Sequence, residues 1–428
     1  MLAFLKRHSE NIRGLSTVPG IIALVIWVLS LMTLWLDQTY PEFSSSQPFK
    51  LFHTDYQTAQ TVLSTVAAAA ITTLGLVYSI VLVVFTTAAG NIGPRLLQRF
   101  TSDQVNQFTA GLFGGTFLYA LTVLHQTDAG FVPSFSIAVT FFLAGLSVLQ
   151  LIYFVHRAST NVTIDVEVAD IARLLERDVS KLIDRVDKQG DRVANPGVDK
   201  FADQIMAQSS GYVTFIDVEA LVKLAKKHEI FISLAHAHGN FIVPDLVLAR
   251  IDQPLLDDER PQIAKKILDS IVVSKSRSPS SDIKFSINLI LEIALRALSP
   301  GVNDTFTAIA CVDRISSALA RPVRRGLPDQ IRLDDNDNPR LYLPDLTLND
   351  LINTAYHPIR RAAMSNILMT KHILDSLGRL YVIGSKEARE VLKYHADLIV
   401  EGTQKTACMQ VDKDYIDDHY KALFSPKE

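Results

Sequence analysis

Long apolar runs separated by short polar segments dominate the first 156 residues, whereas the rest of the chain mixes charged and apolar positions as a water-soluble domain does. A helix needs about 20 apolar residues to cross a hydrocarbon core of roughly 30 Å. Four runs approach this length, at about residues 18–36, 61–88, 108–124 and 132–155. The third is the weakest, because it is short and rich in Gly and Thr. The pattern predicts a membrane α-helical bundle of four transmembrane helices, followed by an α+β cytoplasmic domain.

The change from apolar to mixed composition also sets the expected domain boundaries. Apolar residues at helical spacing between about 165 and 186 indicate a helix directly after the last span. The predicted segments are a cytoplasmic N-terminal segment (1–17), the transmembrane domain (18–156), a helical connector (157–204), an α+β domain with a small β module (205–345) and a helical C-terminal region (346–428).

Basic residues near the ends of the spans indicate how the chain is oriented in the membrane. Arg13 precedes the first span, Arg95 and Arg99 lie between the second and third, and Arg157 follows the fourth, whereas the other side has only Lys50 near the membrane. Lys and Arg are enriched on the cytoplasmic side of membrane proteins. We therefore expect a multi-pass protein of the bacterial inner (plasma) membrane with both termini in the cytoplasm.

The second span carries a stripe of small and hydroxyl-bearing side chains. Its hydroxyl-bearing members recur every seven residues, at Thr65, Thr72, Ser79 and Thr86, and Thr61, Ala68 and Gly75 occupy adjoining positions. Two interpretations are open. Small side chains and hydroxyls favour close packing against another helix. In a ring of subunits, the same stripe would instead line an uncharged, hydrated pore, which makes the four hydroxyl-bearing residues pore-lining candidates.

The third span contains Gly111 and Gly115 in a G-x-x-x-G pattern, which permits close helix packing. No span carries Asp, Glu, Lys or Arg in its interior. Coupled transporters usually keep an ionisable group near the middle of the membrane. The composition of the spans therefore argues against active transport.

A short basic amphipathic helix is expected after the second span, because Gly93–Pro94 marks a turn and Arg95 and Arg99 alternate with apolar residues. On the inner surface of the membrane, such a helix is either an anchor to lipid headgroups or a gate.

Residues 211–251 predict a small β module. We expect a strand over 211–217, a helix over 218–228, and strands over 230–237 and 241–251 around a hairpin-like turn at 238–240. The order is similar to that of a barrel-sandwich, biotinyl/lipoyl-like module, but the turn has no lysine to carry a cofactor, so we expect no covalently bound group.

Two further features of this module are informative. Pro244 has no N–H to donate, so the last strand should be an edge strand or be bulged there. His236 and His238 share a strand face and would supply two metal ligands, but no third ligand has supporting spacing. A structural or surface role is the alternative.

The sharpest motif of the second half follows an apolar helix expected over 283–298. A tight turn is followed by Asn303 or Asp304, either of which can cap the next helix through its first free N–H groups. The residues of this motif are Ser299, Pro300, Gly301, Asn303 and Asp304. They are interpreted either as a ligand or ion site at a helix N-terminus or as a helix cap alone.

Charge and composition exclude several classes of function. A net charge of −3 over 428 residues does not indicate a nucleic-acid partner. The two cysteines, Cys311 and Cys408, are too far apart in the sequence to suggest a disulfide framework. Catalytic triads, phosphate loops and metal clusters at known spacing are absent from the sequence, so we expect no enzyme, cofactor or metal.

The order of these segments resembles a bacterial family of predicted membrane proteins described as domain of unknown function 2254. The segments that carry the resemblance are Ser79–Leu82, Gly93–Leu97, Gly114–Phe117, Tyr153–His156, Ser210–Val213 and Ala297–Asp304. Family members often have Pro-Gly-Asp where this chain has His238-Gly239-Asn240, so no charge-dependent role of that turn carries over. The resemblance implies the architecture and no particular activity.

Two functions remain open on the sequence alone. The first is an oligomeric channel or passive conduit, a homo-oligomer in the lipid bilayer with the second span lining the pore. The second is a membrane-anchored sensory or scaffold protein whose cytoplasmic domain binds a ligand or partner whose identity the sequence does not indicate.

Overall fold

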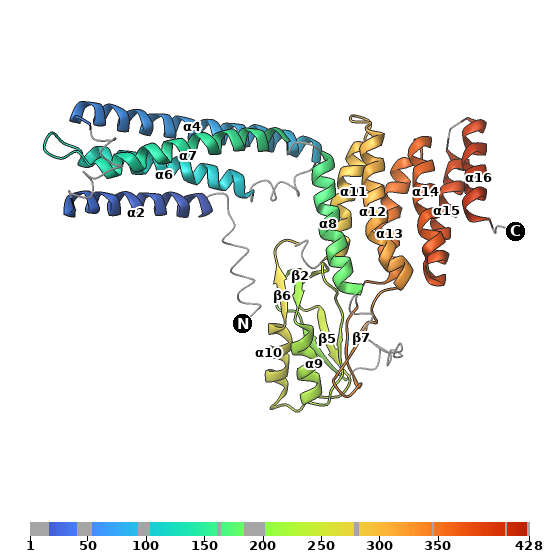
Figure 1. The fold of residues 1–428 in the computed structure, drawn as a ribbon. Coiled ribbons are helices and arrows are strands. Elements are labelled where there is room, and N and C mark those ends of the chain that lie inside the picture. Colours follow the sequence, from blue (N-terminus) through green and yellow to red (C-terminus); the bar gives the residue numbers. More distant parts are fainter. Residues whose placement is uncertain are drawn as a thin grey trace. The chain divides into compact units, whose positions relative to one another are not determined.

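The computed structural model describes residues 17–40, 54–92, 103–160, 164–183, 202–277, 282–344, 346–406 and 409–425. The chain folds as two compact units, residues 1–163 and 164–428. Among the described residues, the first unit contains four long helices, and the second contains strands and helices (Figure 1).

The first unit contains four helices that are long and apolar enough to cross a membrane. They are α2 (Thr17–Thr39), α4 (Tyr56–Ile92), α6 (Gln104–Gln126) and α7 (Ser134–Thr160). The four apolar helices expected from the sequence are confirmed, and α4 begins five residues before its predicted start. The turn between α6 and α7 is short, because the Asp128 carboxylate accepts hydrogen bonds from the backbone N–H groups of Gly130 and Phe131.

The least apolar of these four helices, α6, is also the most buried. It lies between α2 and α4 and also packs against α7 (Figure 1). A Cβ added to Gly111 would lie 2.7 Å from the Cβ of Ile22, and one added to Gly115 would lie 2.7 Å from the Cβ of Ile26. The two glycines therefore allow α6 to approach α2 more closely than any larger residue would.

The second unit has a β part made of two sheets, with strand orders β1-β5-β3-β8-β7 and β4-β2-β6. The strands are β1 (Asp203–Met206), β2 (Gly211–Ile216), β3 (Ile232–Leu234), β4 (Phe241–Ile242), β5 (Val247–Ile251), β6 (Ile271–Ser274), β7 (Ile331–Leu333) and β8 (Pro339–Tyr342). Helices α9 (Val218–Lys227) and α10 (Arg260–Asp269) bury Leu and Ile side chains in the same apolar core as the strands.

The two strands predicted on either side of residues 238–240 do pair, because β3 is antiparallel to β5, but the tight turn predicted between them is wrong. Strand β4 follows that turn and pairs with β2, so residues 238–240 connect two different sheets. The turn is held by β2, because Gly239 N donates to Val213 O (2.8 Å) and Val213 N donates to Asn240 O (2.9 Å). The expected strand over 241–251 is interrupted at Pro244, where the chain turns between β4 and β5. Two helices in the core also distinguish this part from the expected barrel-sandwich.

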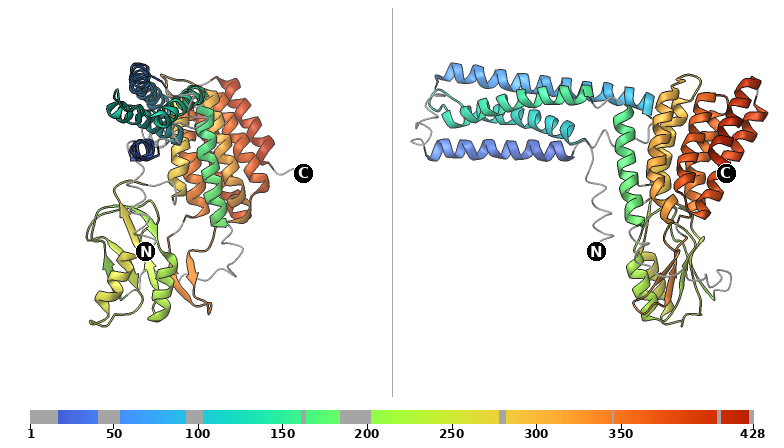
Figure 2. Two further views of the ribbon diagram at one scale, coloured as in Figure 1. Left: turned by 60° about the vertical axis from the view of Figure 1, so that its left-hand side comes forward. Right: turned by 45° about the vertical axis from the view of Figure 1, so that its right-hand side comes forward.

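The rest of the second unit is a layer of roughly parallel helices, with the β part at one end (Figures 1 and 2). The helices are α8 (Ile164–Ile183), α11 (Ile283–Ala297), α12 (Thr305–Arg325), α13 (Leu348–Ala363), α14 (Ile367–Ile383), α15 (Lys386–Lys405) and α16 (Gln410–Phe424). Helix α8, expected as a connector, packs against α11 and α12. The helical layer thus draws on residues that the sequence places in the connector and in the α+β domain.

The close approach of α6 to α2 generates a prediction about stability. Gly115→Ala should lower the free energy of unfolding by about 1–3 kcal/mol, because its Cβ would overlap with Ile26. The matched control is Gly145→Ala in α7, where an added Cβ meets no atom within 4 Å. Thermal unfolding of the purified protein in detergent measures both changes, and equal Tm values for the two variants would contradict this packing.

Candidate functional site

The hydroxyl-bearing stripe of α4 lies on the exposed side of the helix. Thr65, Thr72, Ser79 and Thr86 are all exposed. The opposite side of α4 packs into the bundle through Ala59, Leu63, Ala67, Ala70 and Val77, none of which is more than 5% exposed. Within the part of one chain that the structure describes, the stripe is therefore not a packing seam against α2, α6 or α7.

Each hydroxyl of the stripe donates a hydrogen bond to its own helix. Thr65 Oγ1 donates to Thr61 O (2.7 Å), and Thr72 Oγ1 donates to Ala68 O (2.8 Å). Ser79 Oγ donates to Gly75 O (2.9 Å), and Thr86 Oγ1 donates to Val83 O (2.9 Å). Because the donors are used within the helix, the hydroxyl oxygens present lone pairs, and no charge, on the outer surface of α4.

The stripe extends beyond its hydroxyl groups. The exposed positions 61, 65, 68, 72, 75 and 79 alternate in steps of four and three residues, which is the spacing of a helix seam. All six side chains are Thr, Ser, Ala or Gly. Large apolar side chains flank them, at Ile71, Leu76, Ile80 and Leu82. The stripe is thus a shallow, weakly polar strip between apolar margins.

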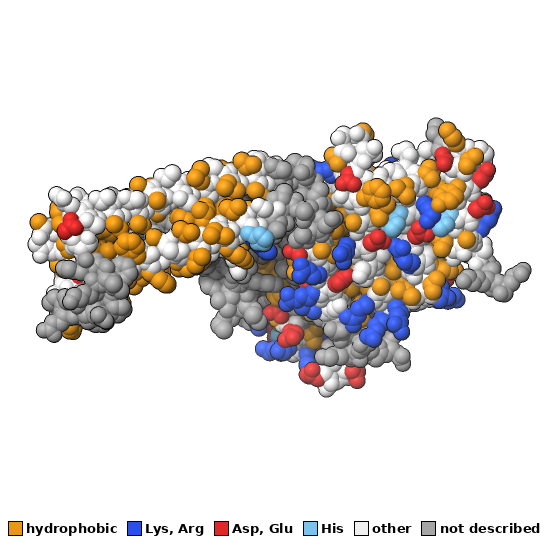
Figure 3. Space-filling model, turned by 45° about the horizontal axis from the view of Figure 1, so that its top comes forward, with side chains coloured by type: hydrophobic (Ala, Val, Ile, Leu, Met, Phe, Trp, Pro, Cys, Tyr) orange, Lys and Arg blue, Asp and Glu red, His pale blue; other side chains and the backbone are white. Residues whose placement is uncertain are grey.

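The exposed faces of the neighbouring helices have a different composition. Their exposed large side chains are Ile21, Leu24, Val25, Trp27, Val28, Leu31, Met32 and Trp35 on α2, and Phe141, Phe142, Val148, Leu149, Ile152, Tyr153 and Val155 on α7. Hydrophobic side chains are spread along the visible surface of the described helices, among polar side chains and backbone (Figure 3). Such faces suit lipid acyl chains, and the small, hydroxylated stripe of α4 departs from them.

Polar side chains inside the bundle bond to one another. Thr116 Oγ1 lies 3.3 Å from Ser147 Oγ, and Gln150 Nε2 donates to Thr109 Oγ1 (2.8 Å), so α6 and α7 are joined at two levels. Near the other end of the bundle, Tyr119 OH lies 2.7 Å from Thr33 Oγ1. These pairs satisfy polar groups that would be costly to leave without a partner in an apolar surrounding.

A buried carboxylate, to which the sequence pattern assigns no role, lies at the end of α2. Asp37 is 3% exposed. Its oxygens accept hydrogen bonds from Phe135 N (3.1 Å), Ser136 N (2.9 Å) and Ser136 Oγ (2.6 Å). Asp37 therefore caps the N-terminus of α7 from another helix. An acidic residue at the very end of an apolar run is the signal that could have pointed to it.

The turn motif of the second half joins α11 to α12, at the end of the helical layer away from the β part (Figure 1). Asp304 caps α12, because its carboxylate accepts hydrogen bonds from Thr307 N (3.1 Å) and Thr307 Oγ1 (2.6 Å), and these bonds lower the pKa of Asp304. The backbone of Asn303 is in the left-handed region, with a φ of 51°. Thr305 Oγ1 accepts a hydrogen bond from the side chain of Asn366, which caps α14. Capping accounts for the geometry of Asp304.

The remaining residues of the motif shape the turn. Ser299 Oγ donates to Arg296 O (2.6 Å), and Val302 N and Asn303 N both donate to Ser299 O. Pro300 and Gly301 are exposed at the tip. The motif thus positions the start of α12 relative to the end of α11.

The remaining candidate residues are the basic pair after the second span and the histidines of the β module. Arg95 and Arg99 lie outside the described residues, so the expected basic helix cannot be placed. His236 is half-buried, its Nε2 atom has no hydrogen-bond partner, and burial lowers its pKa. The structure shows no group of three His, Cys, Asp or Glu side chains arranged for a metal among the residues it describes.

A buried histidine joins α13 and α15. His395 is fully buried, and its Nε2 atom lies 2.8 Å from Asn353 Oδ1. The ring centroids of His357 and His395 are 4.5 Å apart. Burial, together with the nearby His357 and Arg360, lowers the pKa of His395 to about 4. His395 is therefore neutral in the folded protein near pH 7.

The chain matches the family described as Predicted membrane protein (DUF2254) over residues 13–379, which confirms the resemblance drawn from its motifs. Uncharacterized proteins of Mycobacterium bovis and Mycobacterium tuberculosis are each 28% identical to it over 367 residues, which is 83% of this chain and 70% of the relative. No solved structure matches the chain.

The burial of His395 generates a prediction about pH. Its pKa is about 4 in the folded protein, below the usual 6.5, so folding favours the neutral form, whose contribution to stability is complete above pH 6.5. We expect the second unit to lose up to about 3 kcal/mol of stability as the pH falls from 6.5 to 4. His395→Gln should reduce this loss, and denaturant unfolding across this pH range measures it. An unchanged pH dependence in the variant would contradict the assignment.

Proposed function

This chain belongs to the DUF2254 family of predicted membrane proteins, and from the exposed stripe of α4 we propose that it forms a homo-oligomer whose α4 helices line a passive conduit. The observation that supports this proposal is the direction of the stripe, which points away from the chain's own bundle. The proposal places this assembly in the bacterial inner membrane with both termini in the cytoplasm, on the strength of the basic residues that flank the spans.

The two sides of α4 then make different contacts. The side with Leu63 and Val77 packs into the bundle of its own chain. The other side carries small residues in steps of four and three, which let helices of several copies approach around an axis. The large side chains that flank the stripe, such as Ile71 and Leu76, would pack between adjacent copies and exclude lipid from the axis.

The chemistry of the stripe favours passive movement of water or ions. Outward hydroxyl oxygens partly replace the hydration shell of a solute, because their lone pairs are not used by the helix. The stripe carries no ionisable side chain between positions 61 and 86. A conduit of this kind offers no proton- or ion-coupling group, so solutes would move down their own gradients.

A second candidate function is a membrane-anchored protein whose second unit binds a ligand. The observation that favours it is a cavity lined by arginine side chains of α12. This function and the conduit are compatible, since they use different units of the chain.

The conduit predicts that hydroxyl groups of the stripe control flux. The double substitution Thr72→Val and Ser79→Val should lower ion flux into liposomes about tenfold, which corresponds to about 1.4 kcal/mol of additional barrier. The reason is that the lining loses the oxygen atoms that solvate the passing ion. The measurement is ion flux into liposomes that contain the purified full-length chain, followed with a potassium- or chloride-sensitive dye.

The matched control is Thr73→Val, which removes a hydroxyl from the same helix at a half-buried position beside the stripe. It should leave flux unchanged. Wild-type liposomes that conduct no ion or small solute, or equal losses in Thr73→Val and the double variant, would contradict the conduit.

A further inference from the structure

Large apolar side chains are exposed at one end of the helical layer, the end away from the β part (Figure 1). Phe306 is 75% exposed, Val411 is 74% exposed and Leu368 is 50% exposed. Each is the second residue of its helix, which is α12, α16 and α14 respectively. Val302, in the turn before α12, and Met409, the N-cap of α16, are exposed as well. These five residues are called the apolar end below.

Contacts between the helices place the starts of α12, α14 and α16 at one level. The side chain of Asn366 donates to Thr305 Oγ1 (2.7 Å), which joins the start of α14 to the start of α12. Helix α15 leads back from the end of α14 to the start of α16, so α14 and α16 run in the same direction. His419 Nε2 of α16 lies 2.6 Å from Asp375 Oδ1 of α14, near the middle of both helices. The apolar end therefore belongs to one edge of the layer.

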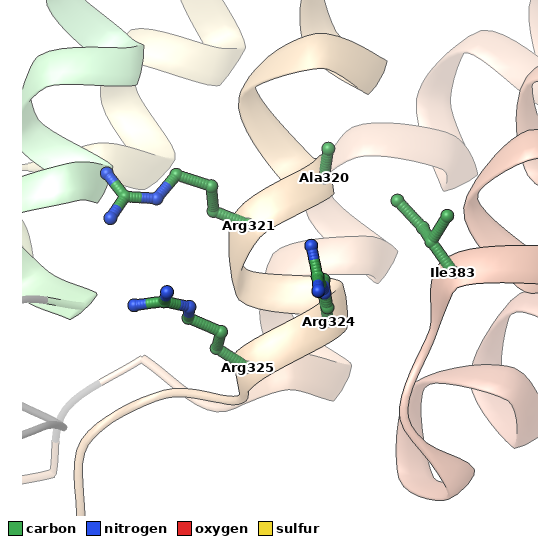
Figure 4. Close-up of a pocket in the computed structure, with 5 residues that line it drawn as sticks. All are labelled: Ala320, Arg321, Arg324, Arg325 and Ile383. Carbon is green, nitrogen blue, oxygen red and sulfur yellow. The ribbon is translucent and has the colours of Figure 1, made fainter.

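Helix α8 also starts at this edge. Ser317 Oγ of α12 donates to Glu176 Oε1 of α8 (2.7 Å), and Arg321 Nη1 donates to Ser180 Oγ (2.7 Å). Figure 4 shows Arg321 extending from α12 toward α8. The two residues of each pair are 141 positions apart in the sequence, so α8 and α12 run in the same direction. The first residue of α8 is thus level with the first residue of α12.

The chain itself keeps the start of α8 close to a membrane surface. Only residues 161–163 separate α8 from α7, which is long and apolar enough to cross a membrane. Arg157 lies in the last turn of α7, and basic residues flank membrane-crossing helices where they leave the hydrocarbon core. A link of three residues spans at most about 14 Å when fully extended. A lipid surface is therefore always within reach of this edge of the layer.

We propose that the apolar end of the second unit inserts into the headgroup region of this membrane. Apolar side chains at an interface bury several ångströms into the boundary between headgroups and acyl chains. The free N–H groups at the starts of α12, α14 and α16 would then face lipid phosphates, which helix N-termini favour. The proposal goes beyond the conduit and uses no residue of α4.

The N-cap of α16 favours lipid over water at this edge. Polar side chains are preferred at N-caps because they accept hydrogen bonds from the free N–H groups. Met409 occupies this position in α16 and makes no such bond, although it is 76% exposed. A long apolar side chain gains nothing there from water, whereas it suits acyl chains.

The test places a fluorescent side chain at the apolar end of the full-length protein. The chain has two tryptophans, Trp27 and Trp35, and both are replaced by Phe. In this background Phe306→Trp supplies the only indole, at an exposed position that accommodates a larger ring. Emission is measured in phosphatidylcholine–phosphatidylglycerol liposomes with and without brominated acyl chains, since bromine quenches an indole that it contacts. We expect about a twofold loss of emission, because an indole at the headgroup level contacts the upper acyl chains.

The matched control is Val382→Trp in the same background. Val382 is 70% exposed and lies on α14, about 21 Å further along the helix than Leu368. Its emission should not change with brominated lipid. The proposal is overturned if the lipid quenches neither variant or quenches both equally. A blue-shifted but unquenched emission from Phe306→Trp would overturn it too, since a protein surface would then cover the apolar end.

Discussion

The first unit depends on the close contact between α6 and α2, where Gly111 and Gly115 meet Ile22 and Ile26. Without side chains at these two positions, a helix of modest hydropathy can occupy the centre of the bundle and contact its three neighbours. Since α6 takes the centre, α4 lies at the periphery and uses only one side within its own chain. The outward direction of the α4 stripe is therefore a consequence of where α6 sits.

The interior of a single bundle is already occupied by polar groups that bond to one another. Thr116 with Ser147, Gln150 with Thr109 and Tyr119 with Thr33 each form such a pair in the described part of the unit. Polar atoms that already have partners gain little from a passing solute. A hydrated path built from α4 would therefore run between copies of the chain, where the hydroxyl oxygens of the stripe face outward.

Much of the fold follows from local pattern, whereas the pairing of distant segments does not. Apolar length alone predicts the four spans, and the pair Asn303–Asp304 before a helix predicts a cap, which Asp304 supplies. The seven-residue period of the hydroxyl-bearing residues shows which face of α4 they share but not which neighbour that face contacts. Strands of two to five residues, such as β4, carry too little alternation to indicate their partners, and the arginine cavity requires α12 and Ile383 of α14 to be neighbours. The burial of Asp37 and His395 depends on such distant contacts as well.

The proposed conduit requires that the α4 stripe faces water, and cysteine accessibility measures this directly. Single variants Thr72→Cys, Ser79→Cys and Leu149→Cys are made in a chain whose own two cysteines are replaced, and they are treated in membranes with a charged thiosulfonate reagent. Only a thiol that ionises in water reacts quickly. We expect rapid modification at Thr72→Cys and Ser79→Cys and slow modification at Leu149→Cys on the exposed face of α7. Equally slow modification at all three positions would contradict it.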